Sequence, residues 1–161
     1  MARVRRHGGR LYVALLDLDH FKRYNDHHGH QAGDRLLKEA AAAWQSRMRR
    51  TDLLARYGGE EFAVLLRDCT PIQAVMVLDD LRAVNPDGQT SSAGIAEWDG
   101  QEGPERLVGR ADRALYEAKH AGRDQIIAAP SPSGRHPDTR ATSSIEPETA
   151  PPSTQIDTKT H

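Results

Sequence analysis

The 161-residue sequence lacks the features that mark several classes of protein. It contains one cysteine, Cys69, so it can form no internal disulfide and no zinc site built from cysteines. Its formal net charge is −1 and its pI is about 6.7, so no overall positive field favours nucleic acid or an anionic membrane. We therefore expect no nucleic-acid partner.

Long apolar runs are also missing. The N-terminus is basic and leads into an apolar run over residues 11–16, but that run ends at Asp17, too soon for a signal peptide or a membrane span. The sequence shows no internal repeat. A chain of this length has room for one domain with a buried core, and we expect a soluble, cytoplasmic domain with no membrane segment.

What the sequence does contain is an alternation of apolar runs and amphipathic stretches. The polar residues 23–33 are interpreted as a loop, or as a short helix followed by a loop. The other predicted elements are a strand over 11–16, a helix from Asp34, a hairpin of strands 53–57 and 62–66, a helix from Pro71 to about Val84, a strand over 90–98, a helix from Pro104 that stops at Gly122, and a strand over 125–129. The β-α-β-β-α-β core predicts an α/β sandwich of the ferredoxin-like type, with an antiparallel-rich sheet flanked by helices.

The composition changes at Pro130. Six of the nine prolines lie between Pro130 and Pro152, among many serines and threonines and few apolar residues. Such a segment cannot bury enough apolar surface to offset the entropy lost on ordering it. We therefore predict a folded domain over residues 1–129 and a disordered tail over 130–161.

Two pairs of carboxylates stand where predicted strands end. Asp17 and Asp19 follow the first strand, and Glu60 and Glu61 follow two glycines at the tip of the predicted hairpin. Such a tip can simply be a solvated polar turn. If the strands are neighbours, however, three or four carboxylates converge at one sheet edge, and such clustering requires a hard cation such as Mg²⁺.

Cationic and imidazole side chains suggest further sites. Lys119 and Arg123 are spaced i, i+4 around the end of a predicted helix and could clamp a polyphosphate, although cations also suit a helix C-terminus without any ligand. Four histidines near the aspartates raise the alternative of a transition-metal hydrolase, but their spacing fits no zinc motif. These are His20, His27, His28 and His30.

Several short motifs identify a family when they are taken together. The hairpin carries Arg56-Tyr57-Gly58-Gly59-Glu60-Glu61-Phe62. Elsewhere the chain carries Asp17-x-Asp19-x-Phe21-Lys22, Asn25-Asp26, Gly29-His30, Gly33-Asp34, Ser92-Ala93-Gly94-Ile95-Ala96, Ala111-Asp112, Tyr116-x-x-Lys119 and Gly122-Arg123. In this order and spacing, residues 11–128 resemble the GGDEF-domain diguanylate cyclases, in the variant with glutamate at the third position of the signature.

The resemblance implies an activity and a fold of the nucleotidyl-cyclase palm type. The family condenses two GTP into cyclic di-GMP, a bacterial second messenger, and releases two pyrophosphates with the help of Mg²⁺ or Mn²⁺. Each subunit of a dimer holds one GTP, so a homodimer is needed for catalysis. Cyclic di-GMP is the product and also a possible inhibitor.

The resemblance also assigns metal-binding and catalytic roles. The metal ligands would be the side chains of Asp17 and Glu60 and the carbonyl of Leu18. Asp19 would either touch the metal or make a structural hydrogen bond. Glu61 would help to deprotonate the ribose 3′-hydroxyl, unless Glu60 or a metal-bound hydroxide does so instead.

Substrate-binding residues follow from the same resemblance. Asn25 and Asp34 would read guanine, and a carboxylate suits this task because it accepts hydrogen bonds from the N1–H and the exocyclic amine of that base. His30 would lie on the substrate side. The phosphates would be held by the backbone amides of Phe21 and Lys22 and, at the β/γ end, by the side chains of Lys119 and Arg123.

Arg49 and Asp52 resemble the family's Arg-x-x-Asp product-inhibitory site. The family often adds an arginine from the next helix, where this chain has the acidic pair Asp79-Asp80, so we expect weakened inhibition. We also expect the usual family segment ahead of the first strand, a helix and Asp-x-Leu-Thr-Gly-Leu, to be missing. That departure leaves open a non-catalytic module that binds GTP or cyclic di-GMP and acts through a partner, although the intact catalytic residues argue against it.

Overall fold

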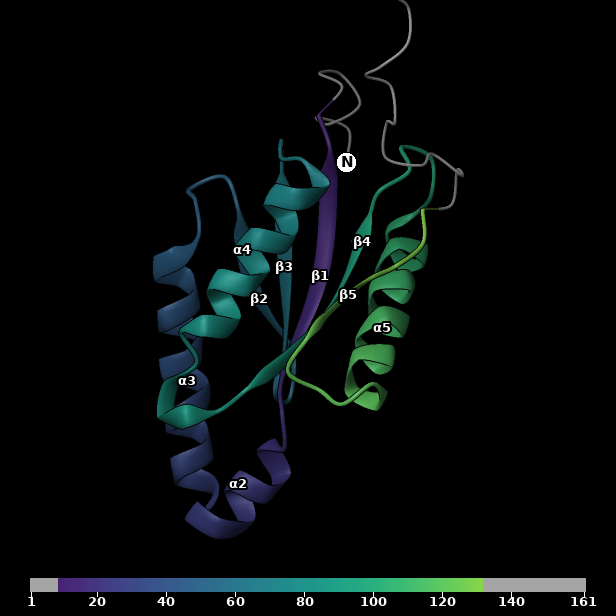
Figure 1. The fold of residues 1–161 in the computed structure, drawn as a ribbon. Helices are drawn as coiled ribbons and strands as arrows, with labels where there is room; N and C mark the ends of the chain where they lie inside the picture. Colours follow the sequence, from purple (N-terminus) through teal and green to yellow (C-terminus); the bar gives the residue numbers. More distant parts are fainter. Residues whose placement is uncertain (1–8, 132–161) are drawn as a thin grey trace, which may run out of the picture.

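The structure is a computed structural model that describes residues 9–131 (Figure 1). Its centre is a five-stranded sheet with strand order β2-β3-β1-β4-β5. The strands are β1 (Leu11–Leu18), β2 (Leu53–Gly58), β3 (Glu61–Arg67), β4 (Ser91–Glu97) and β5 (Ile126–Ala128). Neighbouring strands are antiparallel except for β4 and β5, which are parallel. The expected antiparallel-rich sheet is therefore confirmed, while the predicted tail lies, beyond its first two residues, outside the described part of the chain.

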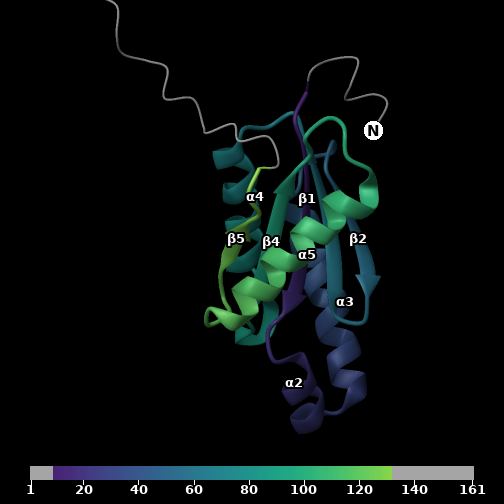
Figure 2. The ribbon, with the colours of Figure 1, turned by 90° about the vertical axis from the view of Figure 1, so that its right-hand side faces the viewer.

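Helices cover both faces of the sheet. They are α2 (Phe21–His28), α3 (His30–Arg47), α4 (Pro71–Ala83), the short 3₁₀ helix η1 (Pro86–Gly88) and α5 (Pro104–His120). α3 and α4 lie on one face and α5 on the other, whereas α2 lies beyond the end of β1 (Figures 1 and 2). Within residues 9–131, no helix combines the length and the apolar character needed to cross a membrane.

The central strand β1 contributes residues to the hydrophobic core on both faces of the sheet. All eight residues of β1 are buried, as the continuous apolar run predicted. Tyr12, Ala14 and Leu16 face the cluster formed with α3 and α4, and the alternate residues Leu11, Val13 and Leu15 face the cluster formed with α5. This alternation places the next odd residue, Asp17, on the α5 face at the end of the strand.

The segment after β1 differs from its prediction. The short helix offered as one alternative for residues 23–33 is confirmed as α2, but no loop follows it, because α3 begins at His30 and not at Asp34. A single residue, Gly29, separates the two helices, with φ of 87°, and its N–H donates to the Asn25 carbonyl at 2.7 Å. Because glycine tolerates positive φ, the chain can reverse within this one residue. The polar composition of the first turn of α3 hid the true start of the helix.

Close contact between β4 and α5 depends on Gly94. A Cβ atom at this position would lie 2.1 Å from the Leu115 backbone nitrogen and 2.2 Å from the Ala111 carbonyl oxygen. Glycine, which has no side chain, leaves room for this close approach. The contact fixes the distance of α5 from the sheet, and with it the place of Lys119 one turn further on.

Candidate active site at the edge of the sheet

Three carboxylates meet where β1 ends and the β2–β3 hairpin turns. Asp17 lies directly opposite Glu61 in the antiparallel register of β1 and β3, so their side chains share one face of the sheet. Glu60 is in the turn between β2 and β3. The hairpin therefore brings Glu60 and Glu61 to the end of β1, where the sequence placed them.

Asp17 is a buried carboxylate, only 3% exposed. Its Oδ2 lies 2.5 Å from Nζ of Lys119, which reaches across from the last turn of α5. Burial raises the pKa of Asp17 to about 6, even though Lys119 acts in the opposite direction, and the charges of Glu60 and Glu61 raise it further. The site therefore holds more negative charge than its one lysine compensates, which suits a divalent cation.

Carboxylates alone do not complete a metal site here. Within the described residues, no group of three or more histidine, cysteine, aspartate and glutamate side chains is placed to hold a metal ion. A cation at Asp17 would therefore need a backbone oxygen such as that of Leu18. The same finding gives no support to the histidine-based metal site, and the ring of His27 is engaged with the Arg23 carbonyl at 3.0 Å.

Asp19 was expected either to touch the metal or to make a structural hydrogen bond, and the structure shows the hydrogen-bonding role. Its carboxylate accepts hydrogen bonds from Thr90 Oγ1 (2.6 Å), Ser92 Oγ (2.7 Å) and the Asp124 backbone N–H (3.0 Å). These three donors come from β4, from the residue before it and from the turn before β5. Asp19 thus ties β4 and the turn before β5 to the end of β1, and of the three or four carboxylates expected to converge, three remain.

The start of α2 is suited to phosphate. His20, the residue before the helix, has φ of 55° and provides no side-chain cap. The first amides of a helix have no acceptor within it, so those of Phe21 and Lys22 remain available, at the positive end of the helix dipole. They follow Leu18, the last residue of β1, by only three and four residues.

The second predicted group of phosphate-binding residues is divided between a helix and a turn. Lys119 belongs to the last turn of α5, whereas Arg123 lies beyond the end of the helix with φ of 65°. The predicted stop at Gly122 is confirmed: this glycine has φ of 117°, and the next N–H bonds back to the Ala118 carbonyl at 3.0 Å. Arg123 is exposed, so its guanidinium faces solvent.

The α2–α3 hairpin brings together the residues expected to read guanine. A Cβ atom on Gly33 would lie 1.7 Å from Oδ1 of Asn25, so the glycine leaves the space that the asparagine side chain fills. Oδ1 of Asn25 is buried and has no hydrogen-bond partner among the described residues. Asp34 is the next residue after Gly33 and is exposed, and His30 is exposed at the first position of α3. An orphaned acceptor beside an exposed carboxylate fits a ligand with several N–H donors.

Arg49 and Asp52 lie in the connection between α3 and β2. This connection is at the opposite end of the strands from the end of β1 (Figure 1). The Asp52 side chain is fully buried and its Oδ2 accepts from Nε of Arg49 at 3.3 Å. Its other oxygen, Oδ1, has no partner within residues 9–131. The Arg49 side chain is about half exposed, at 48%. The pair therefore combines an accessible cation with an unused acceptor.

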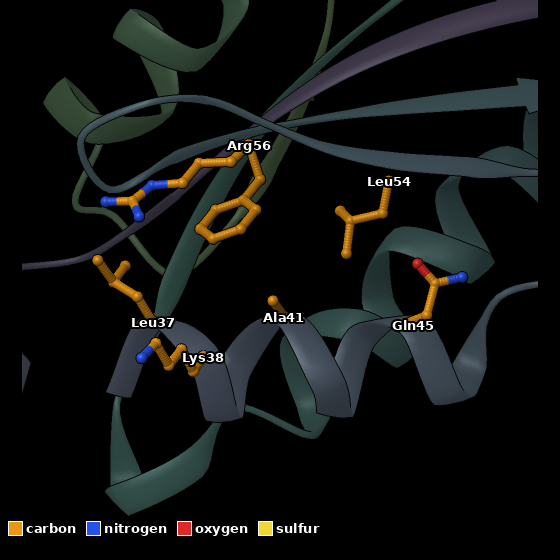
Figure 3. Close-up of a pocket in the computed structure, with 7 residues that line it drawn as sticks. Leu37, Lys38, Ala41, Gln45, Leu54 and Arg56 are labelled. Atoms are coloured by element: carbon orange, nitrogen blue, oxygen red, sulfur yellow. The ribbon is translucent and has the colours of Figure 1, made fainter. Parts of the chain in front are cut away.

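A separate groove of about 390 Å³ runs between α3 and β2 (Figure 3). It is on the face of the sheet opposite to Asp17, and none of the predicted site residues lines it. Its walls are Leu37, Lys38, Ala41 and Gln45 of α3, Leu54 and Arg56 of β2, and Phe62 of β3.

Comparison with known proteins agrees with the geometry. The family model described as diguanylate cyclase, GGDEF domain, matches residues 1–125. Diguanylate cyclase DgcP of Pseudomonas aeruginosa is 45% identical over 139 residues, which cover 80% of this chain and 21% of that protein. The chain spans between 21% and 35% of the length of the first curated relatives it matches.

Solved structures give the same result. Diguanylate cyclase SiaD of Pseudomonas aeruginosa, in complex with its activator SiaC, has a TM-score of 0.74 at 40% identity and covers 80% of this chain and 53% of its own. The GGDEF domain of DgcB from Caulobacter crescentus, in complex with c-di-GMP, has a TM-score of 0.73 at 32% identity, with 79% of this chain and 82% of its own covered.

Proposed function

Because this chain belongs to the diguanylate cyclase GGDEF domain family, we propose that it condenses two GTP into cyclic di-GMP and releases two pyrophosphates. The observation that carries the proposal is the position of Asp17. This buried carboxylate stands opposite Glu61 and in contact with Lys119, and it feels the charge of Glu60. The first amides of α2 follow it by four and five residues. Carboxylates for a cation and donors for phosphates thus share one edge of the sheet, as phosphoryl transfer requires.

We assign the cation to Mg²⁺ or Mn²⁺, held by the carboxylates of Asp17 and Glu60 and the carbonyl of Leu18. The donor set is all oxygen, which these hard cations prefer. The single positive charge of Lys119 does not offset the negative charges of Asp17, Glu60 and Glu61, which supports the assignment of a cation here. When bound, the cation would supply positive charge to the phosphates of the substrate.

The remaining residues bind and orient GTP. Asn25 and Asp34 accept hydrogen bonds from the guanine edge, with His30 beside them. The phosphates contact the amides of Phe21 and Lys22 and the side chains of Lys119 and Arg123. Cations and amides aimed at the phosphates stabilise the negative charge that spreads over them during transfer.

The reaction is an in-line displacement at the α-phosphorus. A ribose 3′-oxygen forms the new bond to phosphorus, the bond to pyrophosphate breaks, and Glu61 accepts the proton of the 3′-hydroxyl. Glu60 is already engaged with the cation, which leaves Glu61 for this role. One hairpin presents one GTP, so the attacking hydroxyl comes from a second copy of the chain, and the active form is a homodimer in the cytoplasm, where GTP is available.

The product would also bind at Arg49 and Asp52. Support comes from the buried Oδ1 of Asp52, which lacks a partner in the described part of the chain and can accept from guanine N–H groups. Asp79 and Asp80 replace the arginine often found on the next helix, and Asp79 is paired with Arg82 at 2.6 Å. Product inhibition is therefore weak.

The test is incubation of the purified chain with GTP and Mg²⁺, with separation of the products by chromatography. We expect cyclic di-GMP to form at a rate that rises faster than linearly with protein concentration. Product should vanish with EDTA and in Glu60→Ala, while Glu61→Gln should bind GTP and turn it over slowly. Binding of GTP or cyclic di-GMP without turnover at any concentration would replace the enzyme with a binding module that acts through a partner.

A further inference from the structure

We propose that Arg82 of α4 is a positioning residue: together with Asp19 it holds the turn after α5 so that Arg123 faces the phosphates of the nucleotide. The inference rests on the proposed function, because it concerns the same phosphate-binding site. Neither Arg82 nor its partner residue in the turn, Asp124, stood out in the sequence. Their role emerges only from the contacts between α4 and the turn.

The turn adopts a backbone conformation that it cannot hold cheaply by itself. Gly122, Arg123 and Asp124 have φ values of 117°, 65° and 46° in succession. Glycine takes positive φ readily, but a residue with a side chain is strained in that region. A turn with two such residues in a row persists only where neighbouring groups hold it.

Arg82 is one of those groups. Its side chain is only 20% exposed. Nη2 donates to Oδ1 of Asp124 at 2.7 Å and also to the backbone carbonyl of the same residue. Nη1 donates to Asp79 Oδ1 at 2.6 Å, and Nε donates to the Ser91 carbonyl at 3.3 Å. One guanidinium thus joins α4, the start of β4 and the turn, which a single ammonium group could not do.

Asp19 holds the same turn from the other side. Its Oδ2 accepts from the Asp124 N–H at 3.0 Å, and the carboxylate is itself fixed by Thr90 and Ser92. Asp124 is therefore held at its N–H, at its carbonyl and at its carboxylate. The residue before it, Arg123, is exposed, so its guanidinium is free to meet an anionic ligand.

Because the turn is already held before substrate arrives, less entropy is lost when the substrate binds. If the turn were free, binding a phosphate through Arg123 would require ordering the backbone at the same time, which weakens binding. With Arg82 and Asp19 in place, only the Arg123 side chain has to be ordered. The expected consequence of losing Arg82 is confined to ligands that carry the outer phosphates.

The experiment compares two nucleotides on the full chain by calorimetric titration with Mg²⁺. The probes are GMP and the α,β-methylene analogue of GTP, which cannot be cyclised. In Arg82→Ala we expect affinity for the triphosphate to fall about tenfold, the scale of one well-placed charge-assisted contact, and affinity for GMP to stay unchanged. Arg113→Ala, which removes an exposed arginine of α5, is the matched control and should change neither affinity.

A double-mutant cycle separates positioning from general stability. Arg123→Ala should lower triphosphate affinity, and adding Arg82→Ala should lower it little further, because both changes remove the same contact. If Arg82→Ala does not fold, Arg82→Lys carries the same test, since it keeps the charge but cannot make the fork of contacts. Equal losses for both nucleotides, no loss for the triphosphate, or additive losses would each overturn the role of Arg82. Failure of the unaltered chain to bind either nucleotide would overturn the proposed function itself.

Discussion

Asp17 is buried and paired within the fold, and its surroundings also favour the binding of a cation. It is buried at the end of a central strand and paired with Lys119, but two glutamates lie close by. A buried carboxylate in this setting favours its neutral form or a second cation. The protein without a bound cation should therefore reveal this conflict through the pH dependence of its stability.

We predict that the contribution of Asp17 to the stability of the metal-free protein falls as pH rises towards neutrality. The pKa of Asp17 in the folded protein, about 6, lies above the ordinary 3.8, so the folded state binds the proton more tightly than the unfolded state. The resulting stabilisation is fully present below pH 3.8 and is lost as pH rises through 6. It amounts to at most about 3 kcal/mol.

Urea unfolding in EDTA at several pH values, beside Asp17→Asn, checks this prediction. The difference in unfolding free energy between the two proteins should change over that pH range in favour of the variant at higher pH. A difference that stays constant with pH would show that the Asp17 carboxyl titrates normally.

Gly33 gives a second prediction at the scale of one residue. Gly33→Ala would push the Asn25 side chain out of its place, because the added methyl would lie 1.7 Å from Oδ1. We expect affinity for guanine nucleotides to fall about tenfold, the loss of roughly one hydrogen bond, in a binding titration with GMP. Gly109→Ala is the matched control, since a Cβ at that helical position meets nothing within 4 Å. Equal GMP affinities in the two variants would contradict the assignment of Asn25.

At the scale of elements, the geometry of the candidate site at the end of β1 depends on how closely α5 approaches β4. The contact at Gly94 is between backbones, so neither side can move away by a change of rotamer. α5 carries Lys119 to Asp17, and the turn behind it carries Arg123. A change in the spacing of this helix therefore affects both the core and the site.

We predict that Gly94→Ala destabilises the protein by about 3 kcal/mol or more, at the upper end for overpacked cores. Denaturant unfolding measures the loss. Gly109→Ala again serves as control, and its stability should rise slightly, since alanine is the better helix former at an unstrained position. A small effect of Gly94→Ala would mean that α5 can shift away from the sheet at little cost.

At the scale of the whole molecule, the two candidate ligand sites lie apart from each other. The Asp17 site is at the end of β1 beside the β2–β3 turn, and Arg49 and Asp52 precede the start of β2, at the other end of that strand. Figure 1 shows that these two ends of the sheet lie apart. A six-residue strand spans roughly 20 Å, so a ligand in one site does not touch the other. Inhibition by product would therefore act through the relation between two copies of the chain or through the strand, not by direct competition.

This separation predicts that inhibition and turnover can be altered independently. Arg49→Ala should raise the cyclic di-GMP concentration needed for half-inhibition at least tenfold, the effect of losing a charged contact, and leave the initial rate unchanged. Arg50→Ala, which removes the neighbouring exposed arginine, should change neither quantity. Initial rates measured at increasing cyclic di-GMP concentration give both quantities for each variant. A lowered initial rate in Arg49→Ala would mean that the two sites are one functional unit.

The sequence by itself predicted most of the order of the elements and the residues of the candidate site. The apolar run of β1, the Gly-Gly turn and the helix start at Pro71 each depend on local steric and hydrogen-bonding rules, which act between near neighbours in the chain. Thr70, for example, caps α4 by accepting from the Gln73 N–H at 3.2 Å. The motif residues were found because their order along the chain is itself specific.

Only the tertiary structure decided which of these residues act together. It turned Asp19 away from the carboxylate cluster and into hydrogen bonds with Thr90, Ser92 and Asp124, and it recruited Arg82 from a distant helix to the same turn. It also started α3 at His30, through one glycine with positive φ. Hydrogen bonds between residues 42 to 105 positions apart depend on how the layers pack, and no local pattern in the sequence encodes that packing.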